Sequence, residues 1–145
     1  MPVRLHLGVL PSPALLASSG LEARYGGIVR GLRCGDLRAY REAVEAHLPA
    51  LIRGGVYLTV EKLQPAVVCA FVRRCARLLG ASRLALPQLA AVLGGAAVGH
   101  ESFPCDADEL ECTLAGLIAA GRIKGYISHD PPFLVVSKKD PFPRR

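Results

Sequence analysis

The last two dozen residues constrain this chain most, because they combine two strand signals with a proline-rich turn. Residues 123–127 contain three β-branched or aromatic side chains, and residues 133–136 form an unbroken apolar run. Residues 128–132 between them have the composition of a turn. The two prolines in that turn cannot donate to a strand ladder, so both strands must end there. Residues 122–143 therefore predict a β-hairpin followed by a proline-rich tail.

Most of the net positive charge lies in the same part of the chain. Its cations are Arg122, Lys124, Lys138, Lys139, Arg144 and Arg145, and its carboxylates are Asp130 and Asp140. Six cations against two carboxylates leave +4 of the formal net charge of +6 carried by the 145 residues. A basic patch indicates an acidic partner, such as nucleic acid, an acidic protein or an anionic membrane surface. Our hypothesis is that the six cations form one stripe that binds phosphates.

Four further elements are predicted between residue 65 and the hairpin. Apolar periodicity, glycine and proline indicate a helix at residues 65–79, a strand at 83–86, a helix at 87–93 and a helix at 106–120. Asp106 and Glu109 give the last helix a capping-box pattern, and Gly121 suits its left-handed end. With the hairpin, the order is helix, strand, helix, helix, strand, strand, which is typical of a winged helix.

The helix at residues 106–120 is acidic where a DNA-reading helix would be basic. Its first turns carry the carboxylates Asp106, Asp108, Glu109 and Glu111. These stabilise a helix N-terminus but repel phosphate, so we do not expect this helix to read bases. Nucleic-acid contact then falls to the lysines and arginines of the hairpin and the tail, which would hold phosphates and carry no sequence information. For the aromatic residues Tyr126 and Phe133 we expect core packing rather than base stacking.

Residues 1–64 show the pattern of paired helices. A helix from Leu21 is expected to end at Gly35, and Asp36 is placed to cap the next one. Pro49 opens a short helix, and residues 56–63 continue it. Hairpins of helices stack into solenoids. The predicted fold is therefore mainly α: helical hairpins in residues 1–64, followed by a winged helix with a small antiparallel β-hairpin in residues 65–145.

The helix at residues 65–79 has two faces of different character. We expect the apolar residues Val68, Phe71, Val72 and Leu79 to face the core. The cations Arg73, Arg74 and Arg77 fall largely on one face. A solvated charged face is the preferred interpretation of these arginines, and nucleic-acid contact is the alternative.

No catalytic, metal or membrane pattern stands out. We find no nucleophile with a base, no carboxylate pair in an apolar context and no phosphate-cradling loop, so we predict no enzyme activity and no cofactor. The five cysteines include no C-x-x-C pair, and a metal set of His100, Cys105, Cys112 and His129 lacks the usual spacing. Apolar runs fall short of the ~18 residues of a membrane span. We expect a soluble intracellular protein without a membrane partner.

Several motifs resemble one known family. They are GYISH at residues 125–129, LVVSK at 134–138 and PFP at 141–143, with Arg53, Leu58 and EKL at 61–63 upstream. Together they resemble the C-terminal part of the PCI-domain subunit of the transcription-coupled mRNA export complex at the nuclear pore. PCI is the module shared by subunits of the proteasome lid, the signalosome and a translation initiation factor. The likeness runs from about residue 7 to residue 143.

The resemblance implies a non-enzymatic scaffold subunit made of stacked helical hairpins and a winged helix. Its implied partners are a large mRNA-export scaffold protein, a small acidic disordered subunit, and RNA or DNA bound without sequence specificity. By position, Lys124, Lys138 and Lys139 would be the wing cations. The implied location is the nucleus, at the nuclear pore, with the cytoplasm as a second location. Family members are much longer, so we expect a fragment or a reduced form.

Two other functions fit parts of the pattern. The first is a PCI subunit of another assembly, such as the proteasome lid, the signalosome or the initiation factor, in which the winged helix contacts proteins only. The second is a freestanding winged-helix DNA-binding factor, which the acidic helix at residues 106–120 disfavours.

Overall fold

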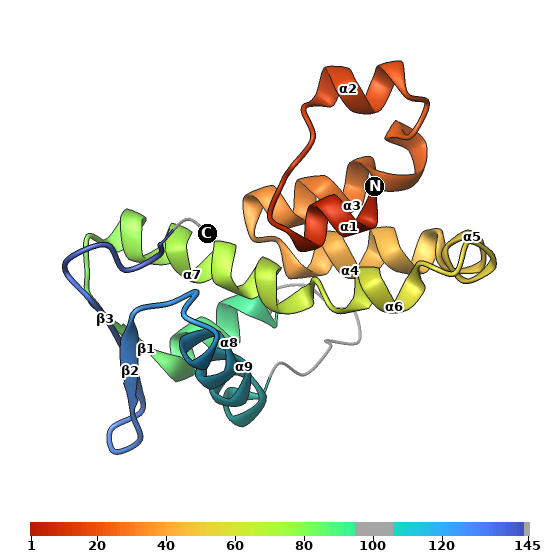
Figure 1. The fold of residues 1–145 in the computed structure, drawn as a ribbon. Coiled ribbons are helices and arrows are strands. Elements are labelled where there is room, and N and C mark those ends of the chain that lie inside the picture. Colours follow the sequence, from red (N-terminus) through yellow and green to blue (C-terminus); the bar gives the residue numbers. More distant parts are fainter. Residues whose placement is uncertain (95–105, 144–145) are drawn as a thin grey trace. The chain divides into compact units, whose positions relative to one another are not determined.

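The computed structural model describes residues 1–94 and 106–143. It divides into two compact units, Met1–Ala70 and Phe71–Arg145, here called the N-terminal and C-terminal units (Figure 1). The division falls inside one long helix, α7 (Gln64–Leu79). The described residues are mainly helical and carry one small antiparallel sheet, which confirms the predicted fold class.

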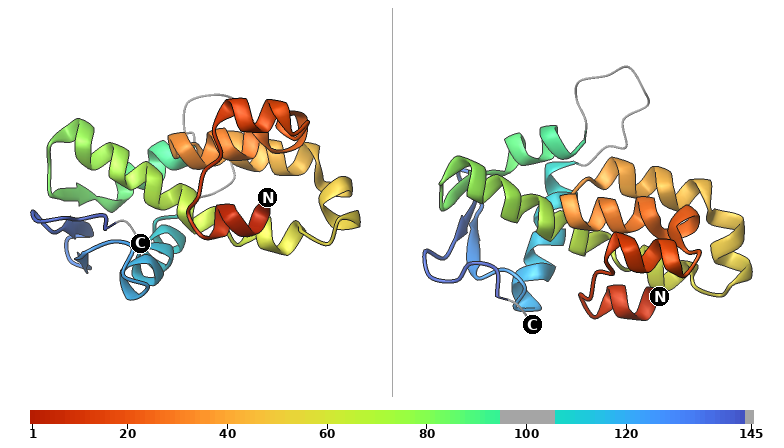
Figure 2. Two further views of the ribbon diagram at one scale, coloured as in Figure 1. Left: turned by 45° about the horizontal axis from the view of Figure 1, so that its top comes forward. Right: turned by 90° about the horizontal axis from the view of Figure 1, so that it is seen from above.

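The N-terminal unit consists of short helices around a closely packed pair. Its elements are α1 (Pro2–His6), α2 (Pro13–Ser18), α3 (Glu22–Cys34), α4 (Leu37–Ala46), α5 (Leu48–Arg53), α6 (Tyr57–Glu61) and the start of α7. The predicted connection between α3 and α4 is confirmed, since Gly35 takes the left-handed conformation at φ 70°. The Asp36 carboxylate then accepts a 2.9 Å hydrogen bond from the backbone N–H of Ala39. These two residues turn the chain so that α3 and α4 run side by side (Figure 2).

Glycines let the α3–α4 pair approach closely. A methyl group built on Gly31 would lie 2.7 Å from Cβ and 2.9 Å from Cα of Tyr40, and one on Gly27 would lie 2.7 Å from Cβ of Ala43. Tyr40 is buried, and its hydroxyl donates to the carbonyl of Val60. The buried side chains of this unit include Leu5, Leu16, Tyr25, Ile28, Val29, Leu32, Leu37, Tyr40, Leu51, Val60, Leu63, Val67, Val68 and Ala70.

The C-terminal unit has the element order predicted for a winged helix. After the end of α7 come β1 (Arg83–Ala85), α8 (Leu86–Leu93), α9 (Ala107–Ala119), β2 (Gly125–Ser128) and β3 (Phe133–Val136). The strands form one antiparallel sheet in the order β1-β3-β2. Its buried face carries Leu84, Leu134 and Val136, and α9 contacts both α8 and β2. This packing anchors the hairpin on the helices, and the described residues of its other face are exposed or half-buried.

Three local predictions need correction. Leu79 is 68% exposed because it lies in the last turn of α7, directly before the left-handed Gly80, where no described neighbour covers it. Tyr126 is 62% exposed because it alternates with the inward-facing strand positions. Asp106 does occupy the N-cap of α9, but its side chain accepts no capping hydrogen bond.

Candidate nucleic-acid interface

Lys124 sits where the hairpin and the tail meet. Its backbone N–H donates a 2.8 Å hydrogen bond to the carbonyl of Pro141, and its carbonyl accepts a 2.8 Å bond from the N–H of Ser137. The residue before it, Ile123, is buried and anchors this end of β2. The Lys124 side chain points to solvent, as predicted from the alternation with Ile123. The tail after β3 therefore folds back beside the start of β2.

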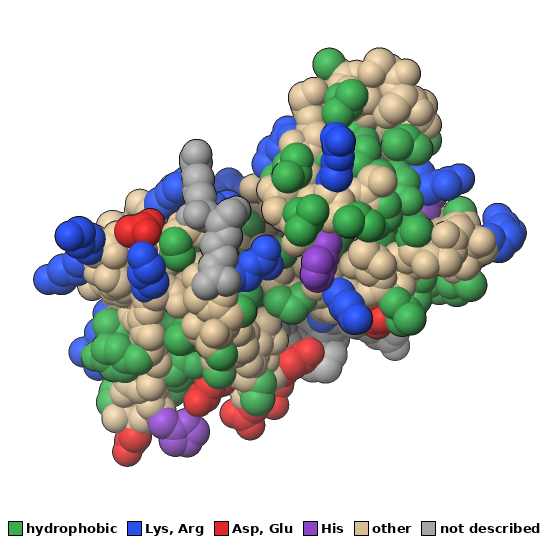
Figure 3. Space-filling view, in the orientation of Figure 1, with side chains coloured by type: hydrophobic (Ala, Val, Ile, Leu, Met, Phe, Trp, Pro, Cys, Tyr) green, Lys and Arg blue, Asp and Glu red, His purple; other side chains and the backbone are tan. Residues whose placement is uncertain are grey.

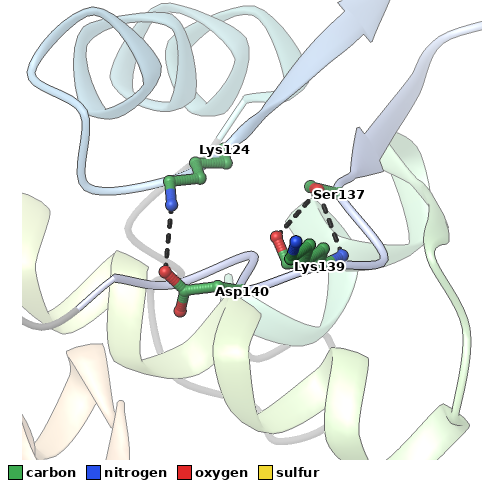
Figure 4. A network of polar contacts seen from close by, with 4 residues as sticks. All are labelled: Lys124, Ser137, Lys139 and Asp140. Atoms are coloured by element: carbon green, nitrogen blue, oxygen red, sulfur yellow. Dashed lines mark hydrogen bonds and ion pairs between the residues drawn. The ribbon is translucent and has the colours of Figure 1, made fainter.

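Asp140 lies directly against Lys124, a pairing that the charge pattern of the sequence does not predict. The Lys124 Nζ is 2.9 Å from Oδ2 of Asp140, and the two side chains are 51% and 58% exposed (Figure 4). Asp140 has a left-handed backbone with φ 50°, which aspartate tolerates better than most residues. Exposed ion pairs of this kind contribute only about 0–1 kcal/mol. A phosphate could therefore compete with Asp140 for Lys124 at little cost.

Lys138 and Lys139 lie on the turn that joins β3 to Asp140. Both residues are exposed. The Ser137 hydroxyl donates 3.0 Å to the carbonyl of Lys139 and accepts a 3.2 Å bond from the Lys139 N–H, which fixes the backbone of this turn (Figure 4). Lys124 and the Lys138-Lys139 pair thus belong to one local structure, because Ser137 contacts the backbone of both Lys124 and Lys139.

Of the remaining predicted cations, only Arg122 lies within the described residues. Arg122 is half-buried, just after α9. Arg144 and Arg145 lie outside the described residues. A continuous stripe of six cations stays a prediction, and the described structure groups three of them, Lys124, Lys138 and Lys139, which we call the wing cations.

Charge in the C-terminal unit is segregated. At the tip of the hairpin, Nδ1 of His129 lies 3.3 Å from Oε1 of Glu111 on α9. Figure 3 shows Asp, Glu and His side chains gathered over α9 and the hairpin tip, and Lys and Arg gathered over the tail at the other end of the hairpin. An anion approaching this unit would therefore be drawn to the tail end and repelled from the start of α9.

Sequence reasoning missed a further cation next to the sheet. The guanidinium of Arg83 lies over the ring of Phe133, 4.2 Å from its centroid. The sequence predicts a short strand that begins at Arg83, but the contact partner of Arg83 depends on the strand register. In the structure, Arg83 pairs with Val135 and the neighbouring Ala85 pairs with Phe133, so both side chains stand on one face.

Within residues 1–94 and 106–143, no group of three or more His, Cys, Asp or Glu residues is placed to hold a metal ion. Of the four residues weighed as ligands, His100 and Cys105 lie outside the described part. None of the described helices is both long enough and apolar enough to cross a membrane.

The known proteins that are similar to this chain over most of its length include the following three. It is 36% identical over 148 residues to enhanced ethylene response protein 5 of Arabidopsis thaliana, covering 99% of this chain and 35% of that protein. It is 43% identical over 128 residues to COP9 signalosome complex subunit 12 of Eremothecium gossypii, covering 83% and 30%. It is 35% identical over 143 residues to PCI domain-containing protein 2 of Xenopus laevis, covering 99% and 35%.

The similarity covers only a part of each relative. The chain spans about a third of the length of the curated proteins it matches. No protein-family model matches it.

Proposed function

We propose that this chain, whose homologues are PCI domain-containing proteins, is part of a non-enzymatic scaffold subunit of a nuclear mRNA export complex. In this proposal it binds a large export scaffold protein and a small acidic disordered subunit, and it acts in the nucleus at the nuclear pore. Its winged helix contacts RNA or DNA without reading sequence. The observation that carries the nucleic-acid part is the segregation of charge in the C-terminal unit (Figure 3).

The proposed contact is electrostatic. Lys124, Lys138 and Lys139 are exposed and lie on the tail side of the hairpin. Lysine is a point charge on a flexible stem, which suits phosphates in varied geometries. Phosphate contacts give affinity and position but carry no sequence information. The carboxylates at the start of α9 keep that helix away from the nucleic acid.

A second candidate is a subunit of a signalosome-like assembly that uses the winged helix for protein contacts only. It is supported by the 43% identity to a protein named COP9 signalosome complex subunit 12. Affinity capture of the chain from cells separates the two candidates. Recovery of export factors supports the first, and recovery of signalosome or proteasome-lid subunits without export factors supports the second.

The nucleic-acid contact is tested by removing positive charge from the wing cations. We predict that changing Lys124, Lys138 and Lys139 together to alanine weakens binding to RNA and DNA of any sequence. Each contact to a single strand contributes about −0.7 to the slope of log K against log salt, so three contacts contribute about −2. The measurement is fluorescence anisotropy with labelled oligonucleotides at several salt concentrations. A control variant with the same change in charge carries alanine in place of Arg24, Arg30 and Arg53, which are exposed cations of the N-terminal unit.

A second variant moves the result in the opposite direction. Asp140→Asn removes the carboxylate that pairs with Lys124, and asparagine tolerates the left-handed backbone at this position. It should strengthen binding at low salt. If the triple alanine variant keeps the wild-type affinity and salt slope, or loses no more than the N-terminal control, the wing cations are not the site.

A further inference from the structure

The winged-helix sheet has a partly exposed face that the electrostatic proposal does not use. Strand register places Tyr126, Val135 and Arg83 in one row across β2, β3 and β1, and Ser128, Phe133 and Ala85 in the next. Side chains of directly paired residues point to the same side of a sheet, and alternate residues share a side. These six residues therefore form one face, which we call the outer sheet face. The intervening row, Ile127, Leu134 and Leu84, points to the core side, where Leu134 and Leu84 are buried.

The outer sheet face presents one aromatic side chain to solvent. The residue Tyr126 is 62% exposed, which is unusual for an aromatic residue on a strand anchored to a core. One strand away, the planar guanidinium of Arg83 covers the Phe133 ring at 4.2 Å. Phe133 is the diagonal neighbour of Tyr126, a relation that puts Cα atoms about 7–8 Å apart. The face therefore offers one open ring and, beside it, a ring capped by a cation.

Positive charge continues from this face into the wing cations. Lys124 is two residues before Tyr126, and its carbonyl accepts from Ser137 opposite it, so the ladder pattern and the side of the strand continue past the end of β2. Lys124 thus extends the outer sheet face toward Lys138 and Lys139. Figure 3 shows hydrophobic side chains over the hairpin, between the Lys and Arg side chains at the tail and the acidic end. Aromatic rings flanked by cations complement a ligand that alternates aromatic faces with anions.

We propose that the outer sheet face binds single-stranded nucleic acid by stacking a base on Tyr126, while the wing cations hold the flanking phosphates. This inference rests on the proposed nucleic-acid contact and adds the preferred form of the ligand. A single strand exposes the faces of its bases, whereas a duplex hides them in its own stack. Proteins that bind single strands combine aromatic platforms with cationic tracks in this way. A purely apolar protein partner fits less well, because it would cover the Arg83 guanidinium without offering it a counter-charge.

The test compares two substitutions of one side chain in the 145-residue chain. Tyr126→Phe keeps the ring, and Tyr126→Thr removes it while retaining strand propensity. Binding is measured with a labelled oligodeoxythymidine of about 16 nucleotides and with the same strand annealed to its complement. We expect Tyr126→Thr to weaken single-strand binding by about 5- to 140-fold, the equivalent of about 1–3 kcal/mol for stacking of one base. Tyr126→Phe should bind nearly as the wild type does.

Two further readouts separate stacking from charge. The salt slope should be unchanged in Tyr126→Thr, because no phosphate contact is lost, and the affinity for the duplex should also be unchanged. If the wild-type chain binds neither form of nucleic acid, the proposed function and this inference both fail. If binding depends on the wing cations but Tyr126→Thr does not change it, the inference alone fails. The inference is also wrong if Tyr126→Phe loses as much affinity as Tyr126→Thr, or if Tyr126→Thr instead abolishes capture of a partner protein.

Discussion

Glycine substitutions in α3 give a sharp test of how closely α3 and α4 pack. Gly26 and Gly31 lie in the same helix, so replacing either by alanine gains the same intrinsic helix propensity, about 0.8–1.0 kcal/mol. A methyl group on Gly26 meets Cγ of Glu22 at an ordinary 3.5 Å. On Gly31 it meets Cβ, Cα and N of Tyr40 at 2.7, 2.9 and 3.0 Å. Backbone atoms cannot rotate away, so α4 would have to move.

The two variants should therefore change stability in opposite directions. Overpacking a core costs about 1–3 kcal/mol, and contact with a backbone favours the upper half of that range. Gly26→Ala should stabilise the N-terminal unit by about 1 kcal/mol, and Gly31→Ala should destabilise it by about 1–2 kcal/mol after the propensity gain. For a unit of this size, 1 kcal/mol corresponds to about 4–8 °C in Tm. Urea and thermal unfolding followed by circular dichroism measure the difference.

A double-mutant cycle checks that the cause is contact between the helices. A methyl group on Gly27 would lie 2.7 Å from Cβ of Ala43, so Ala43→Gly should relieve much of the cost of Gly27→Ala. The cycle then yields a favourable coupling of the order of 1 kcal/mol. A Gly31→Ala variant as stable as Gly26→Ala would refute the close approach of α3 and α4.

Two other residues of the N-terminal unit give predictions of known sign. Burial raises the pKa of Tyr40 above its ordinary value, so the folded chain keeps a proton that the unfolded chain releases above about pH 10. This contribution to stability is present below that pH and is lost above it. Between pH 10 and 11 the free energy of unfolding should therefore fall more steeply in the wild type than in Tyr40→Phe, by up to about 1.4 kcal/mol per pH unit. Equal slopes for the two proteins, measured by urea unfolding at several pH values, would contradict this prediction. Asp36→Ala should lower the free energy of unfolding by about 1 kcal/mol, because it removes the hydrogen bond from the Ala39 N–H, whereas Asp36→Asn should lower it much less. Equal decreases in the two variants would mean that the cap contributes through its charge alone.

The parts of the fold that could be predicted depend on local chemistry. Gly35 and Asp36 ended one helix and capped the next, and Gly121, at φ 68°, followed α9 as expected. The prolines of the turn separated β2 from β3 at the predicted place. In each case the signal and its structural effect lie within a few residues of each other. A single sequence contains that information directly.

The errors concern burial, which depends on neighbours distant in the sequence. Leu79 continues the apolar side of α7 at helical spacing, yet nothing in the described chain packs on the last turn of the helix. Tyr126 has the type of side chain expected in a core, but strand alternation places it on the side opposite Ile127 and Leu134. The helix spacing of Gly27 and Gly31 was a readable signal of close packing that was missed, because glycines four apart share one side of a helix.

The candidate site shows the same difference between local and long-range information. The sequence shows which residues are cations, but it does not show which side chains contact them. Lys124 and Asp140 are 16 residues apart and meet because the tail folds back on β2. Arg83 and Phe133 are brought together only by the pairing of β1 with β3. Long-range pairing of this kind follows from the sheet register, which a charge count does not contain.

The exposed part of α9 adds a reason to expect binding that ignores base sequence. Beyond its acidic start, its exposed residues include Ala115, Gly116 and Ala119, whose side chains have no hydrogen-bond donors or acceptors for base edges. A winged helix that reads a groove needs such groups on this helix. The chemistry that could hold nucleic acid lies instead on the hairpin, at Tyr126 and the wing cations. In the proposed binding mode, this winged helix uses its sheet and tail as the binding surface and keeps α9 away from the ligand.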